Sequence, residues 1–140
     1  MKKILTVLFI LIVFLIGLIF YWNSTNKRTS GIEIIISHKI YYLKDLNKYK
    51  PEQISTCKGE LTGYNVKSIL NSLSLSNNDF AVIDFISKDG GKISIHQKEL
   101  DDLYLTIQTQ NNQNYFRLVI PSDEFNQRWL KYVTKIKLKK

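Results

Sequence analysis

The sequence has few of the residues that bind metals or form disulfide bonds. Among 140 residues it has one cysteine, Cys57, and two histidines, His38 and His96. A single cysteine excludes a disulfide bond within the chain, and the spacing of these three residues is not that of a zinc site. The Gly-rich phosphate-binding loops and the G-x-S-x-G motif of hydrolases are also absent. No catalytic residue is therefore identified from the sequence.

Acidic residues are outnumbered, with 12 Asp and Glu against 20 Lys and Arg and a formal net charge of +8. Lysines gather near the C-terminus, where they can protect a solvated strand edge against aggregation. The alternative is attraction to anionic lipid headgroups, at about 1 kcal/mol per basic residue near the surface. We favour the strand edge. No recognised nucleic-acid-binding module is present, so nucleic acid is not expected as a partner. The lysines concerned are Lys131, Lys135, Lys137, Lys139 and Lys140.

One long hydrophobic run stands at the N-terminus. After Lys2 and Lys3, the residues from Ile4 to Trp22 carry no charge and are mostly Ile, Leu, Val and Phe. A helix of that length reaches roughly 30 Å, about the thickness of the hydrocarbon core of a bilayer. The run ends in bulky aromatic residues, whereas a signal peptidase needs small ones. We therefore expect a transmembrane anchor over residues 1–22 and not a cleaved signal peptide.

The distribution of positive charge slightly favours a cytoplasmic N-terminus. We therefore predict a single-pass protein of the cytoplasmic membrane, held there by residues 4–22, with its domain on the extracytoplasmic side. Residues 23–31 are small and polar, which is typical of a flexible tether. Residues 32–140 would then form the domain.

The pattern of apolar residues in this domain predicts an α+β fold. Val66, Ile69, Leu70 and Leu73 follow the spacing of an amphipathic helix, which Asn65 can cap. Short helical turns are expected at residues 44–50 and 97–102, and a turn-rich connection at residues 59–63. The order of elements predicts a mixed, mostly antiparallel sheet with one main helix. Strands are expected at residues 32–36, 39–43, 52–57, 80–86, 92–96, 104–109, 115–120 and 133–138.

Several motifs between residues 59 and 138 occur in a familiar order. L-T-G-Y-N-V at residues 61–66 is similar to a W/Y-x-G-V-P-L turn that opens a helix, and the strand before Asp89 leads to a D-G turn. At the end, F-R-L-V-I-P at residues 116–121 and R-W-L-K-Y-V at residues 128–133 are similar to P-x-R-x-V-V-P and R-x-V-K-W-L. Together these motifs resemble the molybdopterin-binding domain of sulfite-oxidase-type oxidoreductases.

The resemblance implies a sulfite-oxidase-like fold and a site for the phosphate of molybdopterin. That phosphate would be held by Arg128 and Lys131, with Arg117 in support, because a guanidinium and an ammonium can converge on a dianion. In the family a cysteine thiolate binds molybdenum, and the resemblance makes Cys57 the candidate metal ligand. Cys57 lacks the Gly-, Asn- and Arg-rich loop that surrounds the family's cysteine.

This departure favours a non-catalytic binding or accessory module of the membrane surface, with an anionic ligand or lipid headgroups as its partner. Two alternatives remain. One is a small molybdopterin-dependent oxidoreductase that uses Cys57 as metal ligand. The other is a cell-envelope interaction protein whose resemblance to the family is accidental.

Overall fold

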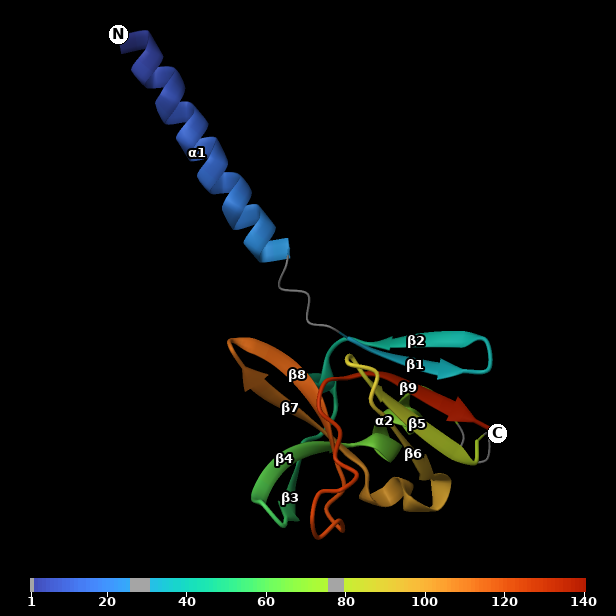
Figure 1. Ribbon diagram of the computed structural model, residues 1–140. Coiled ribbons are helices and arrows are strands. Elements are labelled where there is room, and N and C mark those ends of the chain that lie inside the picture. Colours follow the sequence, from blue (N-terminus) through green and yellow to red (C-terminus); the bar gives the residue numbers. More distant parts are fainter. Residues whose placement is uncertain (1, 26–30, 76–79) are drawn as a thin grey trace.

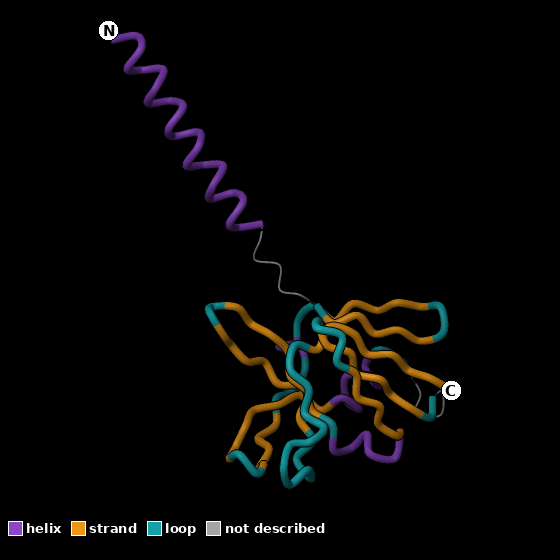
Figure 2. The backbone as a smooth tube through the Cα atoms, viewed as in Figure 1, coloured by secondary structure: helices purple, strands orange, loops and turns teal. Residues whose placement is uncertain are grey.

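The computed structural model describes residues 2–25, 31–75 and 80–140 (Figure 1). Strands predominate (Figure 2). Two of the helical segments are short 3₁₀ helices, η1 and η2. In chain order the elements are α1 (Lys2–Thr25), β1 (Ile32–Ile36), β2 (Lys39–Leu43), η1 (Leu46–Lys48), β3 (Glu52–Thr56), β4 (Gly59–Asn65), α2 (Val66–Ser72), β5 (Val82–Ser87), β6 (Lys92–His96), η2 (Gln97–Asp102), β7 (Tyr104–Gln110), β8 (Gln113–Val119) and β9 (Val133–Lys139).

The strands form two sheets. The first has the order β2-β1-β9-β5-β6, in which β1 and β9 run parallel and all other neighbours run antiparallel. The second is antiparallel and has the order β3-β4-β7-β8. Backbone hydrogen bonds of 2.8 and 3.2 Å between Leu118 and Leu130 connect β8 to the segment that leads into β9. The predicted α+β class with mixed and antiparallel strands is confirmed, although the strands are divided between two sheets.

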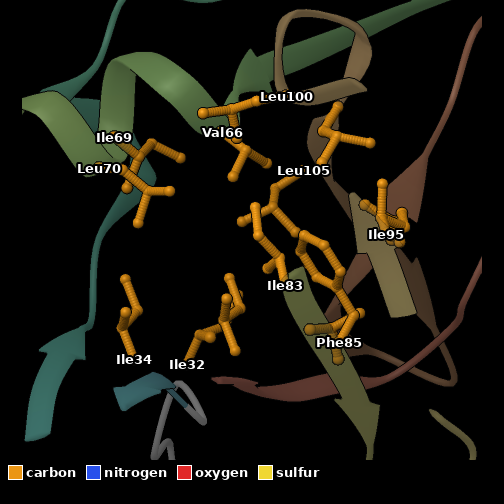
Figure 3. Close-up of a cluster of buried hydrophobic side chains, with 14 of the residues drawn as sticks. Ile32, Ile34, Val66, Ile69, Leu70, Ile83, Phe85, Ile95, Leu100 and Leu105 are labelled. Atoms are coloured by element: carbon orange, nitrogen blue, oxygen red, sulfur yellow. The ribbon is translucent and has the colours of Figure 1, made fainter. Parts of the chain in front are cut away.

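Helix α2 packs on the core as its apolar spacing predicted. Val66, Ile69 and Leu70 are buried, and the side chain of Asn65 caps the helix by accepting a hydrogen bond from the backbone N–H of Ser68 at 3.1 Å. Figure 3 shows these apolar side chains in one cluster with residues of β1, β5, β6 and β7. The inner face of the five-stranded sheet therefore supplies one side of the core, and α2 supplies part of the other.

All of the described core residues lie between Ile32 and Leu138. Helix α1 adds none to them, because its described side chains, which include Thr6 to Tyr21, are exposed. A compact unit with a complete core of its own can fold independently. Since the described core residues all lie within residues 31–75 and 80–140, we expect residues 31–140 to fold without α1.

Helix α1 covers the hydrophobic run for which we predicted a transmembrane helix (Figure 2). Within the described residues, no helix is long and apolar enough to cross a membrane. The prediction that a transmembrane helix precedes the domain is therefore wrong for the described fold. Of the predicted tether, residues 23–25 belong to α1, and residues 26–30 lie outside the described residues.

The connection predicted at residues 59–63 is part of strand β4, which pairs with both β3 and β7. A Cβ atom at Gly63 would lie 3.2 Å from Ile54 Cδ1 and 3.2 Å from Tyr104 Cβ. Glycine at this position therefore lets side chains of the two neighbouring strands approach each other over the backbone of β4. A glycine inside a strand weakens the apolar alternation from which strands are predicted, which explains the missed strand.

The lysine-rich C-terminal strand is not at an edge. β9 is the middle strand of the five-stranded sheet, between β1 and β5. Ile136 and Leu138 point into the core, and Lys135, Lys137 and Lys139 alternate with them on the outer face. Protection of a sheet edge, the interpretation we favoured, therefore does not explain these lysines.

Candidate functional site

Arg128, predicted to contact an anion, lies in the segment between β8 and β9 and is already paired with two carboxylates. Its guanidinium donates to Asp123 Oδ1 at 2.7 Å and to Glu99 Oε2 at 2.5 Å. The hydrogen bonds to Asp123, and then those to Glu99, raise the pKa of Arg128 above its ordinary value. The pair with Glu99 fastens this segment to η2, and the pair with Asp123 lies within the segment itself. An incoming phosphate would have to compete with both carboxylates, and phosphate binding by Arg128 stays a prediction.

Arg117 and Lys131, the other two predicted anion-binding residues, have different surroundings. Arg117 on β8 has its guanidinium carbon 5.0 Å from the centre of the Trp129 ring, a cation–π arrangement. Its Nη1 donates to Gln108 Oε1 at 3.3 Å. Lys131 is exposed, and within the described part of the chain its side chain makes no hydrogen bond or ion pair. No hydrogen bond between described residues joins either of these two cations to Arg128.

Cys57, the predicted metal ligand, lies exposed in the turn between β3 and β4. Its thiol donates a hydrogen bond to Asn126 Oδ1, with 2.7 Å between sulfur and oxygen. No group of three His, Cys, Asp or Glu side chains that could hold a metal ion occurs among residues 2–25, 31–75 and 80–140. Metal binding at Cys57 therefore stays a prediction without further protein ligands among the described residues.

A cavity of about 510 Å³ lies between the β7–β8 hairpin, the β5–β6 turn and the start of β9. Pockets that bind small molecules measure roughly 300–1,000 Å³. None of the residues predicted from the sequence lines this cavity. We call it the tyrosine pocket, and its lining residues include Gln110, Gln113, Asn114, Tyr115, Tyr132 and Thr134.

Two tyrosines provide the aromatic wall of the tyrosine pocket. The ring centroids of Tyr115 on β8 and Tyr132 before β9 are 4.5 Å apart, and the ring planes are tilted by 38°. The Tyr132 hydroxyl donates to Gln110 Oε1 at 2.6 Å, and the Tyr115 hydroxyl donates to Gln108 Oε1 at 2.8 Å. These contacts hold both rings in place, so the aromatic wall is formed before any ligand arrives.

The backbone of Tyr132 is in the left-handed region, with a φ of 56°. This conformation costs roughly 1–2 kcal/mol for a residue with a side chain. The Tyr132 carbonyl accepts a hydrogen bond from the Lys88 N–H at 2.9 Å, and the next residue, Val133, pairs with Ser87 beyond a register shift in β5. Contacts with the β5–β6 turn thus hold the strained backbone, and the ring of Tyr132 stays against Tyr115.

The tip of the β7–β8 hairpin also lines the pocket. Asn111 and Asn112 form its two-residue turn with φ values of 51° and 59°, the geometry of a type I′ turn. The turn sets Gln110 opposite Gln113. Side-chain amides at these positions can donate and accept hydrogen bonds without carrying charge.

One charge of each sign, Lys88 and Asp89, also lines the pocket. A hydrogen bond from the Ser87 hydroxyl, and then one from the Gly91 N–H, hold the pKa of Asp89 below its ordinary value. Asp89 is therefore ionised at neutral pH beside a lysine. The other polar side chains of the pocket are amides and hydroxyls, so the pocket offers uncharged hydrogen-bonding groups next to aromatic rings.

The sequence predicted the strand that carries Tyr115, but not the contact of this tyrosine with Tyr132. One signal was available, because Gln113, Tyr115 and Arg117 alternate along β8 and give one of its faces a polar character. Tyr132 carries no such signal. Its position depends on the path of the segment between β8 and β9.

Comparisons of the chain with models of protein families, with curated proteins and with solved structures find no match. The function is therefore argued from the geometry of the site.

Proposed function

We propose that this protein is a non-catalytic binding module that holds a neutral carbohydrate in the tyrosine pocket. The observation that carries the proposal is the strained backbone of Tyr132, which keeps the Tyr132 ring beside Tyr115 in the cavity. Residues held in sparsely populated backbone regions cluster at ligand clamps and active sites, because the surrounding structure must offset their strain. A tyrosine in this conformation therefore points to a role for its ring.

The chemistry of the lining residues selects the class of ligand. A sugar ring presents C–H groups on its faces and hydroxyl groups at its edge. The aromatic rings of Tyr115 and Tyr132 can pack against the C–H groups of the sugar faces. The sugar hydroxyls can bond to side-chain amides, which donate and accept hydrogen bonds and which the pocket offers at Gln110, Gln113 and Asn114. Both sets of groups line the same cavity.

Charge argues against a phosphate or another strongly anionic ligand in this pocket. Lys88 is accompanied by Asp89, so the charged side chains of the lining nearly cancel. The arginines of the β8–β9 region lie outside the lining, and Arg128 is paired with carboxylates. A neutral ligand needs no compensating charge and matches the lining better.

Isothermal titration calorimetry on residues 31–140 tests the proposal. The titrants are glucose, galactose, N-acetylglucosamine and their β-linked dimers, and the expected result is binding of at least one sugar. Tyr132→Asn removes the ring and retains a residue that tolerates positive φ, so it should abolish that binding. The bound sugar should be recovered unchanged, as a non-catalytic module requires.

Tyr42→Asn is the matched control. Tyr42 is an exposed tyrosine on β2, outside the lining of the tyrosine pocket. This variant should bind the sugar as the unmodified protein does. Absence of binding to every titrant, or equal loss in both variants, would contradict the proposed function.

A further inference from the structure

The outer face of the five-stranded sheet presents lysines beside exposed apolar side chains. The pairing of the strands places Tyr42, Glu33 and Lys135 in one row across β2, β1 and β9. Ile40, Ile35 and Lys137 form the next row. Residues directly opposite each other in a sheet lie on the same face. We call this surface the lysine face, and its defining residues are Ile40, Tyr42, Lys92, Lys135, Lys137 and Lys139.

The lysine face has an excess of positive charge. Lys135 pairs with Glu33 at 3.4 Å, and Lys139 and Lys92 pair with Asp84 at 2.5 and 3.4 Å. Lys137 lies between these pairs and makes no ion pair or hydrogen bond within the described residues. Its four lysines thus face two carboxylates, and Lys137 remains free to bind an anion.

The apolar part of the lysine face lies on the edge strand β2. Ile40 is 53% exposed and Tyr42 is 62% exposed, and both project from the same side of the strand. The neighbouring Ile35 on β1 is only partly buried. No described element covers this surface. Apolar and aromatic side chains beside lysines are typical of surfaces that lie at the boundary between headgroups and acyl chains.

We propose that the lysine face docks on the surface of an anionic lipid bilayer. In this arrangement Ile40 and Tyr42 enter the headgroup boundary, and the ammonium groups of Lys135 and Lys137 contact lipid phosphates. The stem of a lysine can lie along apolar surface while its charged end stays in a polar layer. Nucleic acid matches the lysines but offers no apolar layer for Ile40 and Tyr42, so a bilayer is the better partner.

Sedimentation of residues 31–140 with lipid vesicles tests this proposal. The protein should bind vesicles of phosphatidylcholine with phosphatidylglycerol, bind vesicles of phosphatidylcholine alone much more weakly, and dissociate as salt is raised. Lys137→Gln should lower the affinity about fivefold, which is the loss expected for one lysine near an anionic surface. The double variant Ile40→Thr and Tyr42→Thr should lower the affinity for vesicles more than Lys137→Gln does when both are measured in high salt. Under that condition the apolar contribution to binding dominates.

Lys58→Gln is the matched control, because Lys58 is an exposed lysine on the turn between β3 and β4 in the other sheet. It removes the same charge and should leave vesicle binding within about twofold. Three results would overturn the proposal: no binding to the anionic vesicles, equal losses for Lys58→Gln and Lys137→Gln, or tighter binding to duplex DNA that the Ile40 and Tyr42 changes leave unaltered. Circular dichroism of each variant establishes that a loss of binding is not a loss of fold.

Discussion

The carboxylate of Asp84 lies 2.5 Å from the ammonium of Lys139, although Asp84 is only 2% exposed. Asp84 also accepts a hydrogen bond from the Ser94 hydroxyl at 2.6 Å and pairs with Lys92 at 3.4 Å. A buried carboxylate without such partners would destabilise the fold. The strand order places β9 and β6 on either side of β5, so Asp84 receives a cation from each neighbour.

We expect Asp84→Asn to lower the free energy of unfolding by about 1–2 kcal/mol at neutral pH. A hydrogen bond to a charged group contributes roughly 1.5–3 kcal/mol, and the half-exposed lysines reduce that value through screening by solvent. Urea unfolding of residues 31–140 measures the difference. Glu60→Gln, which changes an exposed carboxylate on β4, should alter stability by less than about 0.5 kcal/mol.

The same carboxylate makes stability depend on pH. Burial alone would raise the pKa of Asp84, but hydrogen bonds from Lys139 and Ser94 and the charge of Lys139 outweigh burial and lower the pKa below 3.8. The contribution of Asp84 is therefore fully present above its unfolded pKa of 3.8 and is lost as pH falls through the lower folded value. The stability difference between the unmodified protein and Asp84→Asn should narrow below about pH 4. A difference that stays constant down to the acid limit of folding would contradict this account.

At Tyr132 we expect glycine to be more stable than alanine by about 1 kcal/mol. Both substitutions remove the ring and its contact with Tyr115, but only glycine adopts a φ of 56° without strain. In an ordinary strand or helix the order is reversed, because glycine is less favourable than alanine by roughly 0.5–1 kcal/mol. Urea midpoints of Tyr132→Gly and Tyr132→Ala at equal m-values measure the difference. Alanine as the more stable variant would mean that Tyr132 is unstrained in solution.

The sequence predicted those parts of the fold that follow from local patterns. Val66, Ile69 and Leu70 repeat at helix spacing and are buried on α2, and apolar β-branched runs mark β1 and β5. β4 was missed because Gly59 and Gly63 remove side chains from its pattern. The division into two sheets was also missed, because the order of strands depends on contacts between distant segments.

The candidate site was less accessible to sequence analysis than the fold. The site assigned from the sequence joined Arg117 and Arg128, whereas the structure gives them separate partners, Trp129 for one and two carboxylates for the other. The tyrosine pocket joins residues of β8 to Tyr132 through the path of a segment without regular structure. Such a path follows from packing, which a periodic pattern does not encode.

The pairing of Arg128 with Glu99 and Asp123 predicts a structural role that a double-mutant cycle can measure. Arg128→Gln should lower the free energy of unfolding by about 1–2 kcal/mol, because it leaves the buried Asp123 carboxylate without its cation. Glu99→Gln removes the more exposed partner and should lower the free energy of unfolding by a smaller amount. The coupling energy between Arg128 and Glu99 should be about 0.5–1 kcal/mol, since both side chains are partly exposed. Additive effects of the two substitutions would show that this ion pair contributes nothing measurable.

The resemblance to molybdopterin-binding domains implies that Cys57 binds the metal and Arg128 the phosphate of the cofactor. The contacts that these two residues make predict that the protein carries no molybdopterin. The thiol of Cys57 is hydrogen-bonded to Asn126, and the charge of Arg128 is balanced by two carboxylates. The protein purified from a host that makes molybdopterin should therefore contain far less than one equivalent of molybdenum and pterin per chain. Mass spectrometry of the metal and fluorescence of the oxidised pterin measure both. Near one equivalent of each, lost on Cys57→Ser, would establish a small oxidoreductase in place of a non-catalytic module. Pterin without metal, lost on Arg128→Gln, would instead assign the protein to carriage of the pterin through its phosphate.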